Sequence, residues 1–216
     1  MLQYPGVTKY ATMTKYLKQG KLWLPPFPDM TQTVSGSGAT SAGTELRLTT
    51  GITASSTARR TCSIPGGFSI GASNGRINWA KKLIWCFDIM RTTSEAETVV
   101  YCQIKTVSTQ GILASHGIGL VIANYALTGE SHDGTTRQTA SLATTLTDSV
   151  LVNVRIEWNP AVSVEFFVNT VSKGILATNL PSGTQAGNLV LSIENGVTGG
   201  TNAILDTSVH MLWQNH

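Results

Sequence analysis

The sequence contains few charged residues, and what it lacks excludes several classes of protein. Asp, Glu, Lys and Arg make up 12% of the 216 residues, which is about half the usual share. Surface helices draw on Glu and Lys, so this composition does not suit a helical protein. No apolar run approaches the length that crosses a membrane, and the first residues lack the apolar core of a secretory signal. We therefore expect no membrane partner, and a chain made in a cytoplasm or exported by a route that the sequence does not show.

Cysteine is also scarce, with only Cys62, Cys86 and Cys102 present. An odd count without C-x-x-C spacing argues against a disulfide scaffold and against a zinc site. Cys86 and Cys102 lie on neighbouring strand candidates and could face each other as a pair. The other interpretation is that the cysteines are buried free thiols, which behave as small apolar side chains.

Residues that favour short strands and polar turns are plentiful. Thr, Ser, Gly and Asn replace the missing charges, and the 41% hydrophobic content is sufficient for a core. Apolar and polar residues alternate strictly in 152–158, a turn follows around Pro160, and the alternation resumes in 162–168. Period-two alternation on both sides of a short turn predicts an antiparallel hairpin with Trp158 and Phe166 buried.

Similar alternation recurs along the chain, in 84–91, 99–105, 189–193 and 209–213. About ten to twelve short strands separated by turns are typical of a two-layer β protein. We predict an all-β fold, a two-sheet antiparallel sandwich of the jelly-roll type. Trp85, Ile156 and Trp213 are expected to be buried between the sheets or against them.

The central hairpins also resemble a known family. The matching segments are Arg155-Ile156-Glu157-Trp158, then 164–169, then Asn179-Leu180-Pro181. Together they resemble the concanavalin-A-like lectin/glucanase sandwich in its laminin-G-type layout, over the region from Trp85 to Trp213. The sequence departs from the family in one turn, where Asn169-Thr170 replaces the usual Asp-Gly. The resemblance implies a sandwich fold and a lectin-like role.

The N-terminal part differs from the remainder of the chain, and we divide the chain into an arm at 1–30, a linker at 31–43 and a sandwich domain at 44–216. Prolines in 25–28 force an extended path, and 31–43 is rich in Gly, Ser and Thr. The net charge is +3 and its excess lies in the arm, which is weak support for a nucleic-acid partner, and we expect none. The residues expected to act in assembly are Lys9, Tyr10, Lys15, Tyr16, Lys18, Lys21, Trp23 and Phe27. They could cover an edge of the same sandwich or reach a neighbouring subunit.

A search for catalytic patterns leads to the expectation that the protein is not an enzyme. Glucanases of the resembled superfamily place carboxylates on one strand as Glu-x-Asp-x-x-Glu, and this pattern is absent. Glu157 and Glu165 are the carboxylates on the best strands, where they could be neighbours on an outward face. We interpret them as solvated strand charges beside Arg155. Neither a Gly-x-Ser-x-Gly elbow nor a phosphate loop is present.

The predicted loops carry residues suited to glycan binding and to metal binding. A sugar site needs a flat aromatic ring and nearby polar partners. The candidates are Trp79, Asn124, Tyr125, His132 and Asp133. Oxygen ligands suitable for the calcium that lectins of this superfamily often hold occur in the loops, but without a recognisable spacing. These are Glu130, Asp133, Asn195, Asn202 and Asp206. We therefore predict no metal and no other cofactor, with calcium as the alternative.

The favoured function is that of a non-enzymatic virion structural protein of a bacteriophage. Low charge, richness in Thr, Ser and Gly, free thiols and the missing signal favour a capsid decoration, tail or receptor-binding component. Its partners would be other virion proteins and itself, as a homo-oligomer such as a trimer, and it would be located in the virion after assembly in the host cytoplasm. The alternative is a carbohydrate-binding module for cell-surface glycans. A weaker alternative is a degenerate glycoside hydrolase.

Overall fold

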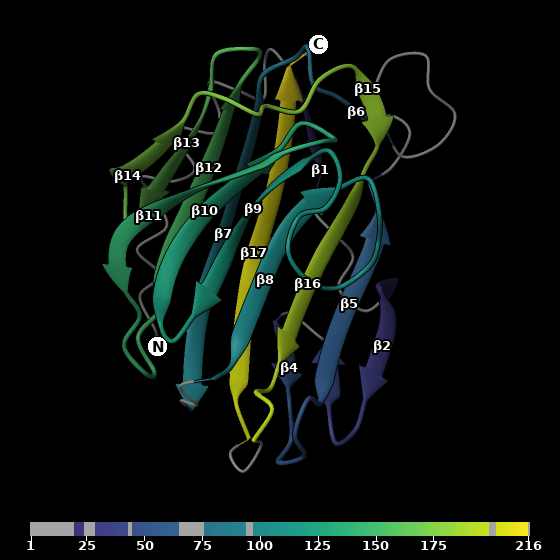
Figure 1. Cartoon of the computed structure of the whole chain (residues 1–216), viewed down its shortest axis with the longest axis vertical. Helices are drawn as coiled ribbons and strands as arrows, with labels where there is room; N and C mark the ends of the chain where they lie inside the picture. Colours follow the sequence, from purple (N-terminus) through teal and green to yellow (C-terminus); the bar gives the residue numbers. More distant parts are fainter. Residues whose placement is uncertain are drawn as a thin grey trace.

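The computed structural model describes residues 20–23, 29–42, 45–64, 76–93, 97–198 and 202–215, with the side chains of 20–23, 93, 209 and 215 left undescribed. These residues form two large antiparallel sheets packed face to face, as predicted (Figure 1). The described ranges contain no α-helix, and accordingly no helix among them could cross a membrane. The predicted all-β sandwich is thus confirmed.

Each sheet has a simple strand order. The eight-stranded sheet runs β14 (Val171–Leu176), β13 (Ser163–Val168), β12 (Val152–Asn159), β7 (Leu83–Thr93), β17 (Ile204–Asn215), β4 (Leu46–Thr49) and β3 (Ala39–Ala42), with β1 (Gly20–Trp23) also paired to β17. The seven-stranded sheet runs β11 (Arg137–Thr145), β10 (Ala126–His132), β9 (Gly117–Ala123), β8 (Val99–Lys105), β16 (Asn188–Glu194), β5 (Thr57–Ser63) and β2 (Thr31–Ser35). A small third sheet pairs β15 (Thr184–Ala186) with β6 (Arg76–Asn78).

The predicted antiparallel hairpin is formed by β12 and β13. Trp158 lies opposite Val164 and Ile156 lies opposite Phe166. Ala161, in the turn, has a φ of 54°, and Val162 N donates to Asn159 O at 3.1 Å. The alternation of buried and partly buried residues along both strands shows why the sequence pattern was informative here.

Inward side chains of both sheets fill the core. Phe166 packs on Gly129 of the facing sheet, where an added Cβ would come within 2.6 Å of the phenyl ring. A side chain at position 129 would therefore displace the ring from its position between the sheets. All five residues expected to be buried are buried: Trp85, Ile156, Trp158, Phe166 and Trp213.

A buried histidine lies where β17 shifts register between Ser208 and Met211. Trp85 Nε1 donates to His210 Nδ1 at 3.2 Å, which fixes the ring proton on Nε2. His210 Nε2 then donates to Thr207 Oγ1 at 2.7 Å, and Thr207 Oγ1 donates to Asp88 O at 2.7 Å. Burial lowers the pKa of His210 to about 3, so the ring is neutral and belongs to the core.

The segment expected to be a flexible linker instead forms strands, which corrects the predicted boundary. β2 pairs with β5 and β3 pairs with β4, so 31–42 crosses from one sheet to the other. All residues of β2 are exposed, because an edge strand can be polar on both faces and still pair along its backbone. The period-two signal is absent from such a strand, and Gly- and Ser-rich composition was misleading.

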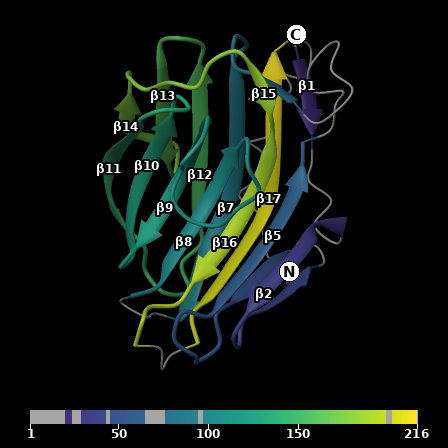
Figure 2. The same ribbon diagram turned by 45° about the vertical axis from the view of Figure 1, so that its right-hand side comes forward.

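The predicted arm is also divided by the structure. Residues 20–23 form β1, which lies beside the C-terminal end of β17 (Figure 2), with Gly20 opposite Asn215 and Trp23 opposite Leu212. This part, which includes Lys21 and Trp23, therefore extends the protein's own sheet, one of the two alternatives expected for the arm. The remaining assembly residues lie outside the described residues: Lys9, Tyr10, Lys15, Tyr16, Lys18 and Phe27.

The cysteines are free, and the possible pair is not formed. Cys86 lies on β7 of the eight-stranded sheet, and Cys102 lies on β8 of the seven-stranded sheet. The two strands follow one another in sequence but belong to different layers, which the sequence pattern could not reveal. Burial raises the pKa of Cys62 and of Cys102 to about 12, so both remain protonated and unreactive thiols.

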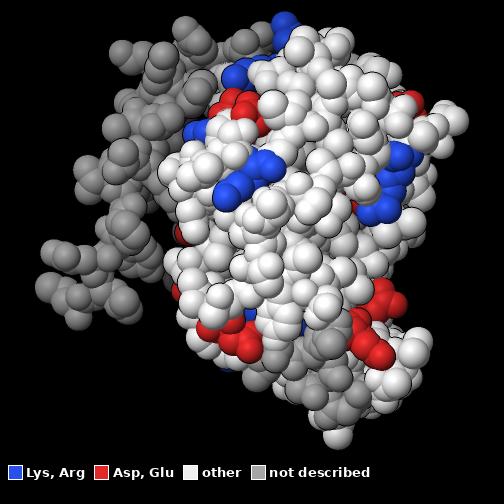
Figure 3. All heavy atoms as spheres, turned by 60° about the vertical axis from the view of Figure 1, so that its left-hand side comes forward, with Lys and Arg blue, Asp and Glu red and all other residues white. Residues whose placement is uncertain are grey.

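The sandwich is closed along one side where β11 meets β14. Gly174 of β14 packs against Leu142 of β11, and an added Cβ would lie 2.8 Å from the leucine. Thr178 N also donates to Gln138 Oε1 across this side at 3.2 Å. The surface seen from that direction is mostly uncharged, with small scattered groups of charged side chains (Figure 3), in keeping with the low charge content.

Candidate functional site

The outward face of the seven-stranded sheet has a polar centre that is covered by a loop. On β8, Cys102 and Ile104 point into the core, so the alternating residues Tyr101, Gln103 and Lys105 point outward. All three are nevertheless buried. The cover is the 106–116 loop between β8 and β9, which passes in front of β8 and β16 (Figure 1).

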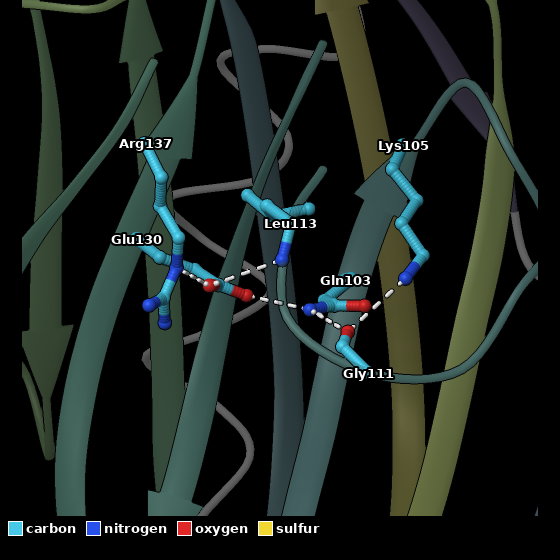
Figure 4. A network of polar contacts seen from close by, with 6 residues as sticks. All are labelled: Gln103, Lys105, Gly111, Leu113, Glu130 and Arg137. Carbon is cyan, nitrogen blue, oxygen red and sulfur yellow. Dashed lines mark hydrogen bonds and ion pairs between the residues drawn. The ribbon is translucent and has the colours of Figure 1, made fainter. Parts of the chain in front are cut away.

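Glu130 of β10 is the centre of the network that holds this loop (Figure 4). Its side chain is completely buried. It accepts hydrogen bonds from Gln103 Nε2 at 2.6 Å, from Arg137 Nε at 2.8 Å and from Leu113 N at 3.5 Å. The guanidinium of Arg137 balances the buried charge, and the Leu113 amide ties the loop to the sheet.

A glycine makes the contact across the strands possible. Gln103, Gly119 and Glu130 lie in one row of the sheet, with the glycine on the middle strand. An added Cβ at Gly119 would lie 2.8 Å from Gln103 Cγ. Because position 119 has no side chain, the Gln103 amide can reach the Glu130 carboxylate over β9.

A second anchor of the loop is the carbonyl of Gly111. It accepts from Gln103 Nε2 at 2.9 Å and from Lys105 Nζ at 3.3 Å. Burial lowers the pKa of Lys105 to about 8, Glu130 opposes this change, and Arg59 adds to it. Lys105 therefore loses its proton more readily than an exposed lysine does. It also lies close enough to Arg59 to be affected by the charge of that residue.

Beside the loop, several buried polar atoms have no hydrogen-bond partner. These are Gln103 Oε1, Ser192 Oγ and Arg59 Nε. Ser192 of β16 lies directly between Arg59 of β5 and Tyr101 of β8 in the register of the sheet. We call these three residues, Arg59, Ser192 and Tyr101, the Arg59 row. Burial, followed by the nearby Glu194 and Glu130, raises the pKa of Tyr101, so its phenol keeps its proton.

At the edge of the Arg59 row, a residue of the loop is hydrogen-bonded to a residue of β16. Gln110 Nε2 of the loop donates to Glu194 Oε2 of β16 at 3.1 Å. Gln110, Glu194 and Arg59 are all partly exposed. The Arg59 row thus begins at the surface and continues beneath the edge of the loop.

Several proteins of known structure share the fold of this chain. Neither a protein family nor a curated protein matches the sequence. The carbohydrate recognition domain of Emp47p is similar in structure at 8% identity, with 89% of this chain and 90% of that chain covered and a TM-score of 0.57. The β-glucanase of Bacillus licheniformis is similar at 10% identity, with 92% and 98% covered and a TM-score of 0.53. The fold is a concanavalin-like sandwich.

A third structure shares this sandwich within a longer chain. It is botulinum neurotoxin type C, whose cell entry depends on interaction with two ganglioside molecules. The two structures are 10% identical in sequence and superpose with a TM-score of 0.58. The match covers 93% of the present chain but 49% of the toxin chain, so this chain spans about half the length of that protein. At these identities the similarity shows the concanavalin-like fold and nothing more specific.

Trp79, expected as a surface platform for a sugar, is instead part of the core of the concanavalin-like sandwich. It is 2% exposed and meets Trp158 edge to face, with 5.6 Å between ring centroids. Trp158 Nε1 donates to the carbonyl of Trp79 at 2.9 Å. In the sequence, Trp79 stands just before a predicted strand, which suggested a loop position. In the structure the indole rings of Trp79 and Trp158 together fill this end of the core, so neither face of Trp79 is left for a ligand.

The other predicted glycan residues are not brought together. Asn124 and Tyr125 form the turn before β10, whereas His132 and Asp133 lie at the far end of that strand. A strand of this length separates its ends by about 20 Å. Two residues at each end of one strand cannot form a single sugar site, and the predicted grouping is therefore wrong.

Each of these pairs is occupied by local contacts. The Arg91 guanidinium lies 4.3 Å from the centre of the Tyr125 ring. His132 Nδ1 accepts from Gly134 N at 2.9 Å. Asp133 Oδ1 accepts from Thr135 N and Thr136 N, both at 2.7 Å, and these amides lower the pKa of Asp133. Such contacts are typical of residues that shape turns.

Of the possible calcium ligands, only Asn195 and Asn202 are brought near each other within the described residues, since both bond to the backbone of Gly51. Glu130 is in the loop network, and Asp206 forms an ion pair with Arg47 at 2.7 Å. Asn195 Nδ2 donates to Gly51 O at 3.3 Å and to Thr53 O at 3.4 Å. Within the described part of the chain, no group of three or more His, Cys, Asp or Glu side chains could hold a metal ion.

Glu157 and Glu165 are neighbours, directly opposite each other on β12 and β13. Glu157 forms ion pairs with Arg155 at 3.1 Å and Lys82 at 3.2 Å. Glu165 accepts from Ser172 Oγ at 2.6 Å. They project from the eight-stranded sheet, the layer opposite the Glu130 network, so the two sets of carboxylates do not share a site.

The residues of the Arg59 row were not predicted as a site. For β8 a signal was available, because alternation in 99–105 places Tyr101, Gln103 and Lys105 on one face. The contribution of Arg59 and Ser192 depends on β8, β16 and β5 being adjacent. These strands are distant in sequence, and no local pattern indicates that they pair.

Proposed function

We propose that this protein binds carbohydrate on the outward face of its seven-stranded sheet, at the Arg59 row beside the 106–116 loop. The observation that supports the proposal is the set of buried, unpartnered polar atoms on this face: Gln103 Oε1, Ser192 Oγ and Arg59 Nε. Buried polar groups in native proteins nearly always have partners, from the protein, from water or from a ligand. Three such groups together therefore favour a binding site.

The chemistry of the Arg59 row, together with the nearby Gln103, suits sugar hydroxyl groups. Arg59 is a donor, Gln103 Oε1 is an acceptor, and the hydroxyls of Ser192 and Tyr101 can act as either. Sugar hydroxyls both donate and accept, so they can complement a mixed set of this kind. The Tyr101 ring and the neighbouring loop would provide the apolar contacts that a ligand site also needs.

The structural comparisons lend general support. Emp47p contributes a carbohydrate recognition domain of this fold, and the botulinum toxin depends on gangliosides. The same fold also hosts a glucanase, so fold similarity alone does not distinguish binding from catalysis. The choice between them depends on the carboxylates.

We infer that the binding is not accompanied by catalysis. Glycosidases hold two carboxyl groups about 5–9.5 Å apart across the scissile bond. On the outward face of the seven-stranded sheet, Glu130 and Glu194 lie on β10 and β16 with β9 and β8 between them. Three strand spacings amount to about 14 Å. In addition, the buried Glu130 carboxylate is fully engaged with its donors, which leaves it unsuited to proton transfer.

The virion role expected from composition remains a second candidate. It draws on the basic and aromatic residues of 1–30, whose sequence suits docking on another subunit. Pairing of β1 with β17 favours edge covering for 20–23, while the role of 1–19 stays a prediction. Glycan binding and a place on a bacteriophage particle are compatible, since a receptor-binding component needs both.

A glycan array followed by calorimetry tests the binding proposal. Ser192→Ala and Tyr101→Phe each remove one hydroxyl from the Arg59 row. Thr139→Ala is the control, because Thr139 is exposed on β11 at the other side of the same face. We expect each row variant to lower affinity about tenfold, as for one lost ligand hydrogen bond, with the control unchanged. Failure of the wild-type protein to bind any glycan would overturn the proposal.

A further inference from the structure

Arg59 differs from every other cation on the outward face of the seven-stranded sheet. Arg137 is paired with Glu130, and Lys105 Nζ donates to Gly111 O. Within the described ranges, no hydrogen bond or ion pair is formed by Arg59, and its buried Nε has no partner. Arg59 as a residue is partly exposed although its Nε is buried, so a molecule from solution can reach the exposed part of the side chain.

The adjacent Arg60 shows what a structural arginine looks like in this strand. Its side chain points to the other face and donates to Met30 O at 2.8 Å, Thr40 Oγ1 at 2.8 Å and Gln32 Oε1 at 3.1 Å. These bonds tie β5 to its neighbours. Arg59 performs no such bracing, so its presence on a strand face needs another explanation.

Glu194, an acidic residue on the strand next to Arg59, is engaged elsewhere. Glu194 lies two pairs further along β16, opposite Thr57, whereas Ser192 lies opposite Arg59. Diagonal neighbours of this kind are within reach of a long side chain. The Glu194 carboxylate instead accepts from Gln110 at 3.1 Å, and no ion pair joins it to Arg59 among the described residues. The loop thus leaves the guanidinium available.

We propose that the glycan bound here is acidic, and that the carboxylate of a uronic or sialic acid unit binds the Arg59 guanidinium. This inference rests on the proposed function and specifies its ligand class. A planar guanidinium that forms no hydrogen bond or ion pair within the described ranges is suited to bidentate binding of a carboxylate. Ser192 Oγ, directly beside it, adds a donor, and Lys105 contributes positive charge beneath the loop.

The remaining groups explain why a sugar acid fits better than a simple anion. Gln103 Oε1 is a buried acceptor without a partner, and an acceptor repels an anion but binds a hydroxyl. The protonated Tyr101 phenol can bond to a hydroxyl or a ring oxygen. A molecule that presents one carboxylate together with several hydroxyls matches this combination of donors and acceptors.

Matched pairs of glycans test the inference. Calorimetry would compare hyaluronan oligosaccharides with their methyl esters, and sialyllactose with its methyl ester, at low and moderate salt. For at least one pair we expect the acid to bind at least tenfold more tightly than the ester, with a preference that weakens as salt rises. The pair that shows the effect identifies the source of the carboxylate.

Variants connect the preference to Arg59. Arg59→Gln should remove the difference between acid and ester, and Arg59→Lys should keep part of it, because lysine retains the charge but loses the bidentate geometry. Arg76→Gln is the matched control, since Arg76 is exposed on β6 outside the seven-stranded sheet. Thermal unfolding would establish that the variants are folded.

The outcomes separate this inference from the proposed function. Equal affinity for acid and ester, or a preference that persists in Arg59→Gln, would overturn the acidic-ligand inference while leaving glycan binding intact. Binding of neutral glycans alone would have the same consequence. If no acid, ester or neutral glycan binds the folded protein, both the inference and the proposed function fail.

Discussion

Two buried polar side chains, Glu130 and His210, occupy opposite layers and are stabilised in different ways. Glu130 is stabilised because Arg137, Gln103 and a backbone amide donate to its carboxylate. His210 is neutral, because it is completely enclosed with the Trp85 N–H on one side and Thr207 on the other. Each makes a testable contribution to stability.

Protonation of His210 should make the fold sensitive to acid. Its folded pKa is lowered from 6.5 to about 3, so between these values the unfolded chain binds a proton that the folded chain does not. The stabilisation is complete above about pH 6.5 and falls by up to about 1.4 kcal/mol per pH unit below it. Urea unfolding from pH 7.5 to 4 should show this slope, and His210→Phe should reduce it. An identical slope in the variant would contradict the assignment.

The elements around the site divide into a rigid sheet and a loop held at two points. The 106–116 loop is attached to the sheet through the Leu113 amide and the Gly111 carbonyl. Both attachments depend on the Gln103–Glu130 contact, which Gly119 permits. The hairpin of β12 and β13, by contrast, is fixed by packing of Phe166 against the other sheet.

Loss of the Glu130 charge should release the loop. Glu130→Gln replaces one carboxylate oxygen by an amide nitrogen that cannot accept, so either Gln103 or the pair of Arg137 and the Leu113 amide loses its acceptor. We expect a loss of about 2 kcal/mol in the free energy of unfolding and faster hydrogen exchange in 106–116. Glu165→Gln, on the other sheet and half-buried beside Ser172, is the control and should change neither. Unchanged exchange in Glu130→Gln would show that the loop is held by other contacts.

The hairpin gives a matched pair of packing variants. Phe166→Ala should lower the free energy of unfolding by about 3–5 kcal/mol, because it leaves a cavity between the sheets. The adjacent Phe167 faces outward beneath the Arg155 guanidinium, 3.9 Å from its ring centre. Phe167→Ala should cost about 1 kcal/mol, the value of a cation–π contact at the surface. Similar losses in both variants, measured by urea unfolding, would refute the assignment of faces.

At the scale of the whole molecule, the N-terminal strands β1, β2 and β3 pair with strands of the two sheets and so form part of the sandwich. β1 extends the eight-stranded sheet, and β2 and β3 cross between the layers. The sandwich therefore includes residues that composition assigns to an arm and a linker. Removing them should have graded consequences.

Deleting residues 1–23 removes β1 with its four cross-strand pairs. We expect a folded protein that is less stable by about 1–3 kcal/mol, the sum expected for such pairs. Deleting only 1–19 should leave stability nearly unchanged and tests the predicted role in self-association by light scattering. If the shorter deletion keeps the oligomeric state of the full chain, residues 1–19 do not mediate assembly.

The sequence predicts those strands of the fold that have one face buried in the core and the other face exposed to solvent. Alternation identified the β12–β13 hairpin and the burial of Trp85 and Phe166, because a one-residue shift would expose the whole apolar set. It failed for β2, whose faces are both exposed, and for Trp79, whose burial depends on a distant indole. The Arg59 row was not predicted because it is formed by strands that pair only after the chain has folded.

The central claim is that the outward face of the seven-stranded sheet binds glycan, and an NMR titration tests it most directly. Backbone resonances would be followed while hyaluronan and sialyllactose are added to the full chain. We predict shifts that cluster on β5, β8 and β16 around Arg59, Tyr101 and Ser192, with weaker changes in 106–116. Shifts confined to the eight-stranded sheet, or no shifts with any glycan, would contradict the claim.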